Sequence, residues 1–165
     1  MKAHKRLLTI VAAATIGLVI ATGCAQYATG AGVIPSANHE STDRLDKALF
    51  AFSFDGPKKK LSGRYYDHGT GDHLKFEGID SYVDDPGNND NCLAAYGLYE
   101  SKTKDKPGEG TFRLIACDGG APGGYTGDMI SIYVMTGPLA GYTNAGQLLY
   151  GNIKTHSRPQ PVPSF

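Results

Sequence analysis

The sequence predicts a single all-β domain, an antiparallel sandwich or barrel of about seven strands. Phe50, Phe52 and Phe54 alternate with smaller residues, and this period of two is typical of a strand with one buried face. Clusters of glycine, proline and asparagine separate the alternating segments, as expected for short strands joined by turns. No stretch beyond residue 23 shows sustained helical periodicity.

The expected strands follow one another within residues 47–157. In the segment near residue 130, Ile130, Ile132 and Val134 share one face of a strand. A domain of about 110 residues suffices for one core and not for two domains. The seven expected strands are Leu49–Phe54, Leu61–Asp67, His73–Val83, Cys92–Tyr99, Thr111–Cys117, Met129–Met135 and Gln147–Thr155.

The segments on either side of this domain lack the strand pattern. Residues 24–46 contain Gly30, Gly32 and Pro35 with little apolar periodicity, so we expect a flexible tether. Residues 158–165 carry three prolines, which predicts a disordered tail.

Residues 1–23 have the three parts of a secretory signal peptide. Lys2, Lys5 and Arg6 form a basic start, an uncharged and mostly apolar stretch covers residues 7–20, and small residues follow. The alternative is a retained transmembrane helix, which needs roughly 20 apolar residues. The fourteen residues of the apolar stretch fall short of that length, so we expect cleavage and export.

The segment IATGC at residues 20–24 resembles a bacterial lipobox, in which the cysteine is alkylated with diacylglycerol and becomes the first residue after cleavage. Ala21 stands where leucine is the commoner residue. The alternative is an ordinary secreted protein cut nearby, for example after Gly30. Lipidation of Cys24 predicts a protein that is anchored to a membrane of the cell envelope and faces outside the cytoplasm, since two or more acyl chains anchor stably.

Cys92 and Cys117 would then remain as an even pair in an oxidising compartment, where disulfides persist. In a hairpin, the residue numbers of each opposed pair add up to the same sum, which is twice the number at the middle of the loop. The loop at residues 100–110 predicts a sum of about 210, and Cys92 and Cys117 give 209. We therefore expect a disulfide across neighbouring strands, with a stabilisation of roughly 3–4 kcal/mol from loop closure. Two buried free thiols are the alternative.

The charge balance argues against nucleic acid as a partner. Beyond residue 23 the chain keeps thirteen basic and sixteen acidic residues, a net charge of −3. Nucleic-acid binders concentrate basic charge on one face. The run of lysines at residues 58–60 beside Gly56 and Pro57 indicates a solvated turn.

The segment DHGTGDH at residues 67–73 is the strongest candidate for a metal site. A three-residue turn would place His68 opposite Asp72 and Asp67 opposite His73, which gathers ligands that zinc or copper accepts. Neighbouring strand residues point to opposite faces, so all four could converge only in a distorted turn. The simpler interpretation is a polar hairpin tip whose aspartates bond their own turn, and no cofactor is expected.

Signatures of the common enzyme classes are missing. The sequence has no Gly-x-Ser-x-Gly elbow, no His-Glu-x-x-His and no Walker-type phosphate loop, so we expect a protein without catalytic activity. Ten tyrosines and no tryptophan are compatible with a carbohydrate platform. Tyrosines at alternate strand positions are, however, more often half-buried sheet residues.

Three segments occur in a suggestive order: YDHGTG at residues 66–71, DGG at 118–120 with Asp128 beyond it, and GNIKTH at 151–156. They resemble a small β-rich module of exported bacterial and archaeal proteins. Its usual features are a Tyr-x-Asp-His hairpin, an Asp-Asn-Gly turn with Pro-Gly beyond it, and a closing Gly-Asn-Ile-x-x-His strand. Gly119 replaces the usual asparagine, and the cysteine pair is a further departure. The resemblance implies an exported β-rich fold over residues 47–156 with no assigned catalytic activity.

Together these features predict an exported lipoprotein whose β-domain is a non-catalytic structural or binding module. Its expected partners are a membrane, through Cys24, and an envelope protein or surface ligand. One alternative is an envelope protein that binds a metal or small ligand through His68 and His73. The other is an enzyme of unrecognised type.

Overall fold

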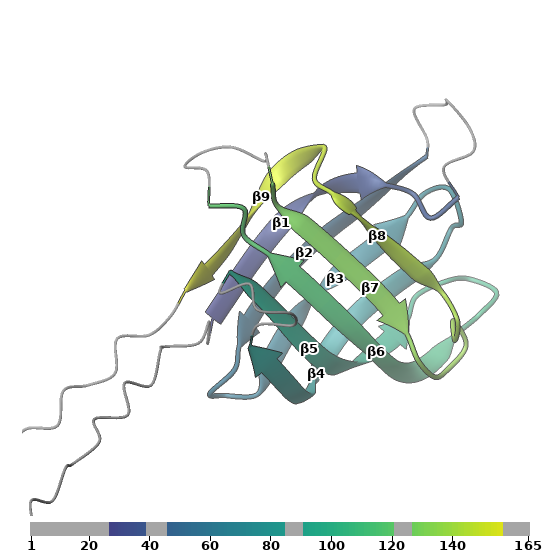
Figure 1. The fold of residues 1–165 in the computed structure, drawn as a ribbon. Helices are drawn as coiled ribbons and strands as arrows, with labels where there is room; N and C mark the ends of the chain where they lie inside the picture. The colour runs from purple at the N-terminus through teal and green to yellow at the C-terminus, as the bar shows by residue number, and fades with distance from the viewer. Residues whose placement is uncertain (1–26, 39–45, 85–90, 121–126, 157–165) are drawn as a thin grey trace, which may run out of the picture.

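The computed structural model describes residues 27–38, 46–84, 91–120 and 127–156. Nine antiparallel strands form one sheet in the order β8-β7-β6-β5-β4-β3-β2-β1-β9 (Figure 1). The strands are β1 (Tyr27–Pro35), β2 (Lys47–Asp55), β3 (Lys60–Asp67), β4 (His73–Asp84), β5 (Cys92–Ser101), β6 (Gly108–Cys117), β7 (Met129–Val134), β8 (Thr143–Gln147) and β9 (Tyr150–His156). The predicted signal peptide, Cys24 and the tail at 158–165 lie outside the described residues.

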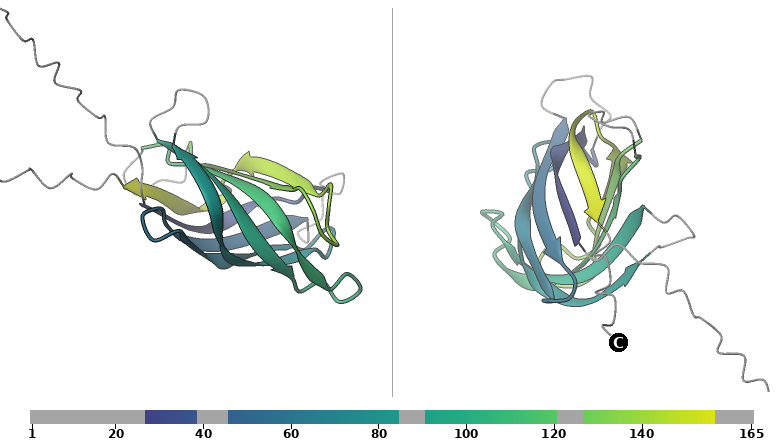
Figure 2. Two further views of the ribbon diagram at one scale, coloured as in Figure 1. Left: turned by 90° about the horizontal axis from the view of Figure 1, so that it is seen from below. Right: turned by 90° about the vertical axis from the view of Figure 1, so that its left-hand side faces the viewer.

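The sheet curls into a half-barrel, so that β6, β7 and β8 cover β1, β2 and β3 (Figures 1 and 2). The edge strands β8 and β9 are separated only by Leu148 and Leu149. The Leu148 amide donates to the carbonyl of Asp128, just before β7, at 3.0 Å, and the Leu149 amide donates to the carbonyl of Val33 in β1 at 2.7 Å. Because two residues span about 7 Å, the opposite edges of the sheet must lie close together.

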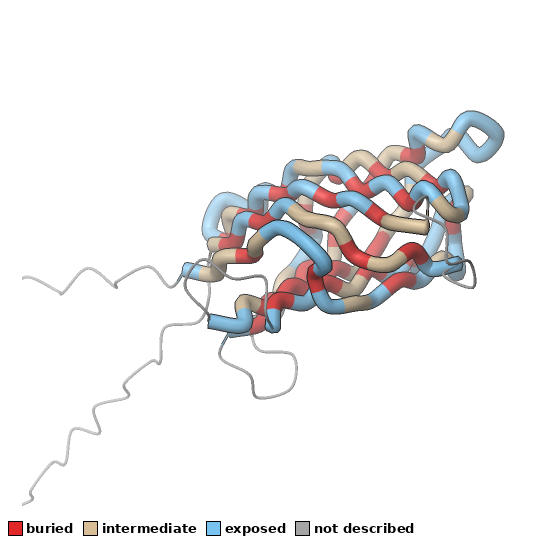
Figure 3. The backbone as a smooth tube through the Cα atoms, turned by 90° about the horizontal axis from the view of Figure 1, so that it is seen from above, coloured by how far each residue is buried: buried red, intermediate tan, exposed pale blue. Residues whose placement is uncertain are grey.

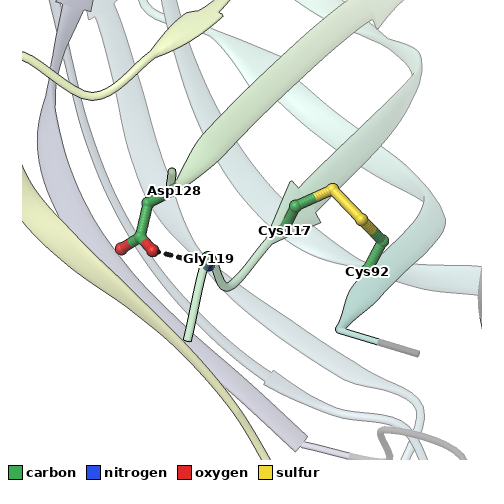
Figure 4. Close-up of a disulfide and its surroundings, with 4 residues drawn as sticks. All are labelled: Cys92, Cys117, Gly119 and Asp128. Atoms are coloured by element: carbon green, nitrogen blue, oxygen red, sulfur yellow. Dashed lines mark hydrogen bonds between the residues drawn. A yellow bond between two sulfur atoms is a disulfide. The ribbon is translucent and has the colours of Figure 1, made fainter. Parts of the chain in front are cut away.

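Side-chain hydrogen bonds also join the two edges. Asn144 in β8 donates through Nδ2 to the carbonyl of Pro35 at 2.9 Å. The buried carboxylate of Asp128 accepts the amide of Gly119 at 2.8 Å (Figure 4) and the amide of Ile153 in β9 at 2.6 Å. These hydrogen bonds satisfy backbone groups that have no neighbouring strand to pair with.

Side chains fill the interior of the curled sheet. Buried and exposed residues alternate along the strands (Figure 3), and Phe50, Phe52 and Phe54 all point inward as predicted. Burying a large apolar side chain contributes about 2–3 kcal/mol each, which makes this core the main source of stability. The largest fully buried side chains are Tyr65, Tyr99, Phe54, Phe112, Ile34, Leu61, Leu74, Leu93, Leu114, Ile130, Ile132 and Ile153.

The expectation of an all-β antiparallel fold is confirmed, but the count of about seven strands is too low. The tether predicted over residues 24–46 is wrong for Tyr27–Pro35, which forms β1 and pairs with both β2 and β9. Its inward positions include glycine because large neighbours occupy the space. A Cβ atom at Gly30 would lie 2.6 Å from a ring carbon of Phe52.

The last strand also differs from the prediction. Gln147–Thr155 was expected to be one strand, but the chain changes its pairing partner within it. Gln147 belongs to β8 and pairs with Met129 in β7, whereas Tyr150 begins β9 and pairs with Val33 in β1. The chain before Gln147, from Thr143, is the second strand missing from the prediction.

The predicted disulfide is confirmed. Cys92 and Cys117 are directly opposed in β5 and β6 and are joined by a disulfide (Figure 4). The described parts of the chain contain no helix long and apolar enough to cross a membrane.

Candidate functional site

The hairpin between β3 and β4 has a register different from the predicted one. Tyr66 is opposed to His73, and the Asp67 amide donates to the Asp72 carbonyl at 2.9 Å, so four residues form the turn instead of three. The Asp67 carboxylate accepts the amide of Gly69 at 2.9 Å, which holds the longer turn. Gly71 completes it with a φ of 75°, a conformation that glycine adopts without strain.

Asp67 points into the interior and is fully buried. It belongs to a chain of polar side chains, the Asp67 network, made of Ser36, Tyr65, Asp67, Tyr142 and Asn144. Asn144 donates to the Tyr65 hydroxyl at 2.7 Å, the Tyr65 and Tyr142 hydroxyls bond at 2.7 Å, and Tyr142 donates to Asp67 at 2.7 Å. Ser36 donates to the other carboxylate oxygen. The network thus ties β1, β3 and β8 together.

The Asp67 network has clear electrostatic consequences. Burial alone would raise the pKa of Asp67, but the hydrogen bonds from Ser36, Tyr142 and the backbone amides outweigh it and hold the pKa below the ordinary value of 3.8. Burial raises the pKa of both Tyr65 and Tyr142 well above 10.0, so both hydroxyls stay protonated and can donate.

The four predicted metal-site residues do not converge. Asp72 is buried and forms an ion pair with Lys106 at 3.2 Å. His68 and His73 remain on the outer surface, where their rings lie 4.3 Å and 5.4 Å from the ring of Tyr66. In the described ranges, no group of three or more His, Cys, Asp or Glu side chains is placed to hold a metal ion. The histidines are therefore brought together on one face and the aspartates are turned away from it.

Tyr66 and His73 belong to a row of side chains that crosses the outer face of five strands. Successive pairing places Tyr150 beside Val33, Val33 beside Leu49, Leu49 beside Tyr66, and Tyr66 beside His73. Three of them are large and exposed: Tyr150 by 61%, Leu49 by 42% and Tyr66 by 37%. Such a continuous exposed apolar row is typical of a binding surface.

Two hollows lie beside this row and share Ala51; we call them together the outer groove. One, of about 400 Å³, is lined by Leu49, Arg64, Tyr66 and His73. The other, of about 500 Å³, has a mostly small and polar lining: Thr29, Gly30, Ala31, Phe52, Ser53, Ser62, Gly63 and Asn152.

The groove is hollow because small residues occupy most of its central positions. Ala31, Ala51 and Arg64 are opposed across β1, β2 and β3, so two of three central positions hold only a methyl group. A Cβ atom at Gly63 would lie 2.2 Å from the Ala51 carbonyl oxygen, so no larger residue fits there without backbone movement.

Cationic groups stand around the groove. The Lys47 ammonium lies 5.6 Å from the centre of the Tyr150 ring, and Arg64 is exposed on the groove wall. Partial burial and the nearby charges of Arg64 and Lys102 lower the pKa of His73, so this imidazole is neutral at pH 7.

Comparison with known proteins identified no relative: no family model matches the chain, and no similar protein was found among curated proteins or solved structures.

Proposed function

We propose that this protein is a non-catalytic binding module held at the cell envelope through a lipid anchor at Cys24. The observation that carries the proposal is the outer groove with its row of Tyr150, Leu49 and Tyr66, large side chains that remain 61%, 42% and 37% exposed. Large exposed apolar surface costs free energy unless a partner uses it, and a curled sheet with a filled interior offers its outer face for binding.

The position of the carboxylates supports the non-catalytic part of the proposal. Asp67, Asp72 and Asp128 are buried and bond backbone amides, hydroxyls or Lys106. Among the described residues that line the outer groove, none is a carboxylate, so His73 has no acidic partner there for general acid–base catalysis. The two aspartates of the predicted hairpin therefore serve the fold.

The anchor would hold the domain close to the membrane. Tyr27, the first residue of β1, follows Cys24 by three residues, a reach of about 10 Å when extended. The bilayer would then lie near the end of the half-barrel where β1 begins, and the outer groove would face sideways into the envelope.

The intact mass of the protein, extracted from its native membrane in mild detergent, tests this proposal. We expect a chain that begins at Cys24, heavier by its acyl groups and lighter by two protons for the disulfide. Cys24→Ser, as the control, should abolish the acyl mass and release the protein from the membrane fraction.

An unmodified chain that begins after residue 24 would overturn the anchor. Metal measured on the same sample tests the competing function. Stoichiometric zinc or copper that is lost with His68→Ala, but kept with His156→Ala, would assign the protein to metal binding instead.

A further inference from the structure

We propose that the outer groove binds an anionic glycan, with sugar rings against Tyr66 and Tyr150 and acidic groups at Arg64 and Lys47. This inference rests on the proposed function, because it names the ligand class of the same binding face. It is carried by three features of the face: its charge, its exposed rings and its hydrogen-bonding floor.

The charge of this face is opposite to that of the chain as a whole. Beyond residue 23 the net charge is −3, yet β9, β1, β2 and β3 present mainly cations to the outside. Of their two carboxylates, Asp67 points inward and Asp55 pairs with Lys58 at 2.9 Å. The cations on these four strands are Lys47, Lys60, Arg64 and Lys154, of which Lys154 forms an ion pair with Asp118 at 3.9 Å. Such segregation of charge attracts an anionic ligand.

The exposed rings indicate that the ligand has apolar faces. Tyrosine offers a flat apolar ring with a hydroxyl at its end, and such rings bind partners that are apolar on one side and hydrated on the other, as sugars are. Tyr66 and Tyr150 lie on β3 and β9, three strand spacings apart, which is about 14 Å. One sugar ring cannot contact both, so the groove fits a chain of sugars.

The floor of the larger hollow, further along the strands from the two rings, supplies hydrogen-bonding groups. Thr29, Ser53 and Ser62 present hydroxyls, and Asn152 presents an amide, which together match sugar hydroxyl groups. Arg64 can bond a carboxylate with two parallel N–H donors. A protein partner usually fills its interface centre with large apolar side chains, whereas this floor is made of small and polar ones.

Calorimetric titration of the lipidated protein in mild detergent tests the inference. The probes are hyaluronan hexasaccharide as the carboxylated glycan, heparin hexasaccharide as the sulfated one and chitohexaose as the neutral one. We expect an acidic probe to bind at least tenfold more tightly than chitohexaose, with an affinity that falls as salt is raised.

Three variants probe the groove, and one serves as a matched control. Tyr66→Ala, Arg64→Gln and Ala51→Trp should each weaken binding of the acidic probe at least tenfold; Ala51→Trp places a large ring at the lining residue that the two hollows share and removes no charge or core contact. Tyr133→Ala removes a tyrosine that is 48% exposed on β7, away from the groove, and should leave the affinity unchanged.

The inference would be overturned by no binding of either acidic probe, by equal binding of chitohexaose, or by equal losses in the control variant. Self-association of the protein, seen by sedimentation and abolished by Ala51→Trp, would assign the groove to a second copy of the chain. The intact mass tests the anchor at Cys24 independently, so failure of glycan binding can be told apart from failure of the proposed function.

Discussion

Asp67 is the residue whose role depends most on its surroundings. Sequence alternation predicts that Asp67 and His68 point to opposite faces, and they do: Asp67 is fully buried and His68 is exposed. A carboxylate inside a sheet is costly unless donors surround it. The donors are the hydroxyls of Ser36 and Tyr142 and the amides of Ala37 and Gly69. They keep the carboxylate charged, and by accepting their hydrogen bonds it holds separate parts of the fold together.

Asp67→Asn should destabilise the domain by about 3 kcal/mol, because in either orientation the new amide nitrogen would face a backbone amide, of Ala37 or of Gly69, that can only donate. Its effect should depend on pH. The folded-state pKa of Asp67 lies below its unfolded value, so the stabilisation is fully present above the unfolded pKa and is lost as the pH falls through the folded one. Urea unfolding at pH 7, 5 and 3 measures this.

The wild-type protein should therefore lose more stability than Asp67→Asn between pH 5 and pH 3. Asp105→Asn, in the exposed turn between β5 and β6, is the control and should match the wild type throughout. Equal pH profiles for the wild type and Asp67→Asn would show that the carboxylate is not held charged by its donors.

Among the elements, β1 shows where pattern-based prediction fails. Its inward positions include Ala28 and Gly30, which give no apolar signal in the sequence. They are small because Phe52 from β2 and Ile153 from β9 already fill the space next to Gly30. When large side chains of neighbouring strands fill the space inside a strand, its own inward residues are small and do not show the alternation that identifies a strand in the sequence.

The β5–β6 hairpin shows the opposite case, in which local arithmetic is sufficient. One loop joins the two strands, so the middle of that loop sets the register and places Cys92 opposite Cys117. The same arithmetic was wrong by one residue for β3–β4, since the Asp67 carboxylate stabilises a four-residue turn.

Replacing both cysteines by serine should destabilise the domain by about 3–4 kcal/mol, because the disulfide closes a loop of 25 residues in the unfolded chain. Thermal unfolding with and without a reducing agent measures the effect. The reductant should lower the Tm of the wild type and leave that of the double variant unchanged. A wild-type Tm that is insensitive to full reduction would contradict this account.

For the whole molecule, the decisive event is the meeting of the two sheet edges. Within Leu148 and Leu149 the chain passes from the edge strand β8 to the edge strand β9, and the Asp128 carboxylate accepts the amide of Ile153 in β9. Asp128 and β9 therefore meet at the seam where the two edges of the sheet come together.

Asp128→Ala should open this seam locally, because it leaves the amides of Gly119 and Ile153 without their acceptor. We expect a destabilisation of about 2–3 kcal/mol from the two lost bonds to a charged group. Hydrogen exchange should become faster at Ile153 than at Leu114, an inward residue in the middle of the sheet. Unchanged protection of the Ile153 amide would show that the carboxylate does not hold the edge.

The outer groove could not be found from the sequence, although each of its residues was visible there. Tyr66, Leu49 and Tyr150 come from three strands, and their alignment depends on the pairing of β1 with both β2 and β9. Val33 of β1 lies between Leu49 and Tyr150, so the row cannot be recognised unless β1 is known to be a strand. Of the two hairpin histidines, His73 belongs to this row and His68 lies beside it, and the rings of both contact Tyr66.

The sequence by itself determined the all-β class, the inward phenylalanines, and the pairing of Cys92 with Cys117. These depend on period-two alternation and on a single hairpin loop, both of which are local. Only the tertiary structure decided the curl of the sheet, the burial of Asp67 and the row that ends at Tyr150. Each depends on contacts between residues far apart in the sequence, 75 positions for Asp67 and Tyr142 and 109 for Pro35 and Asn144, and chain connectivity alone does not specify such contacts.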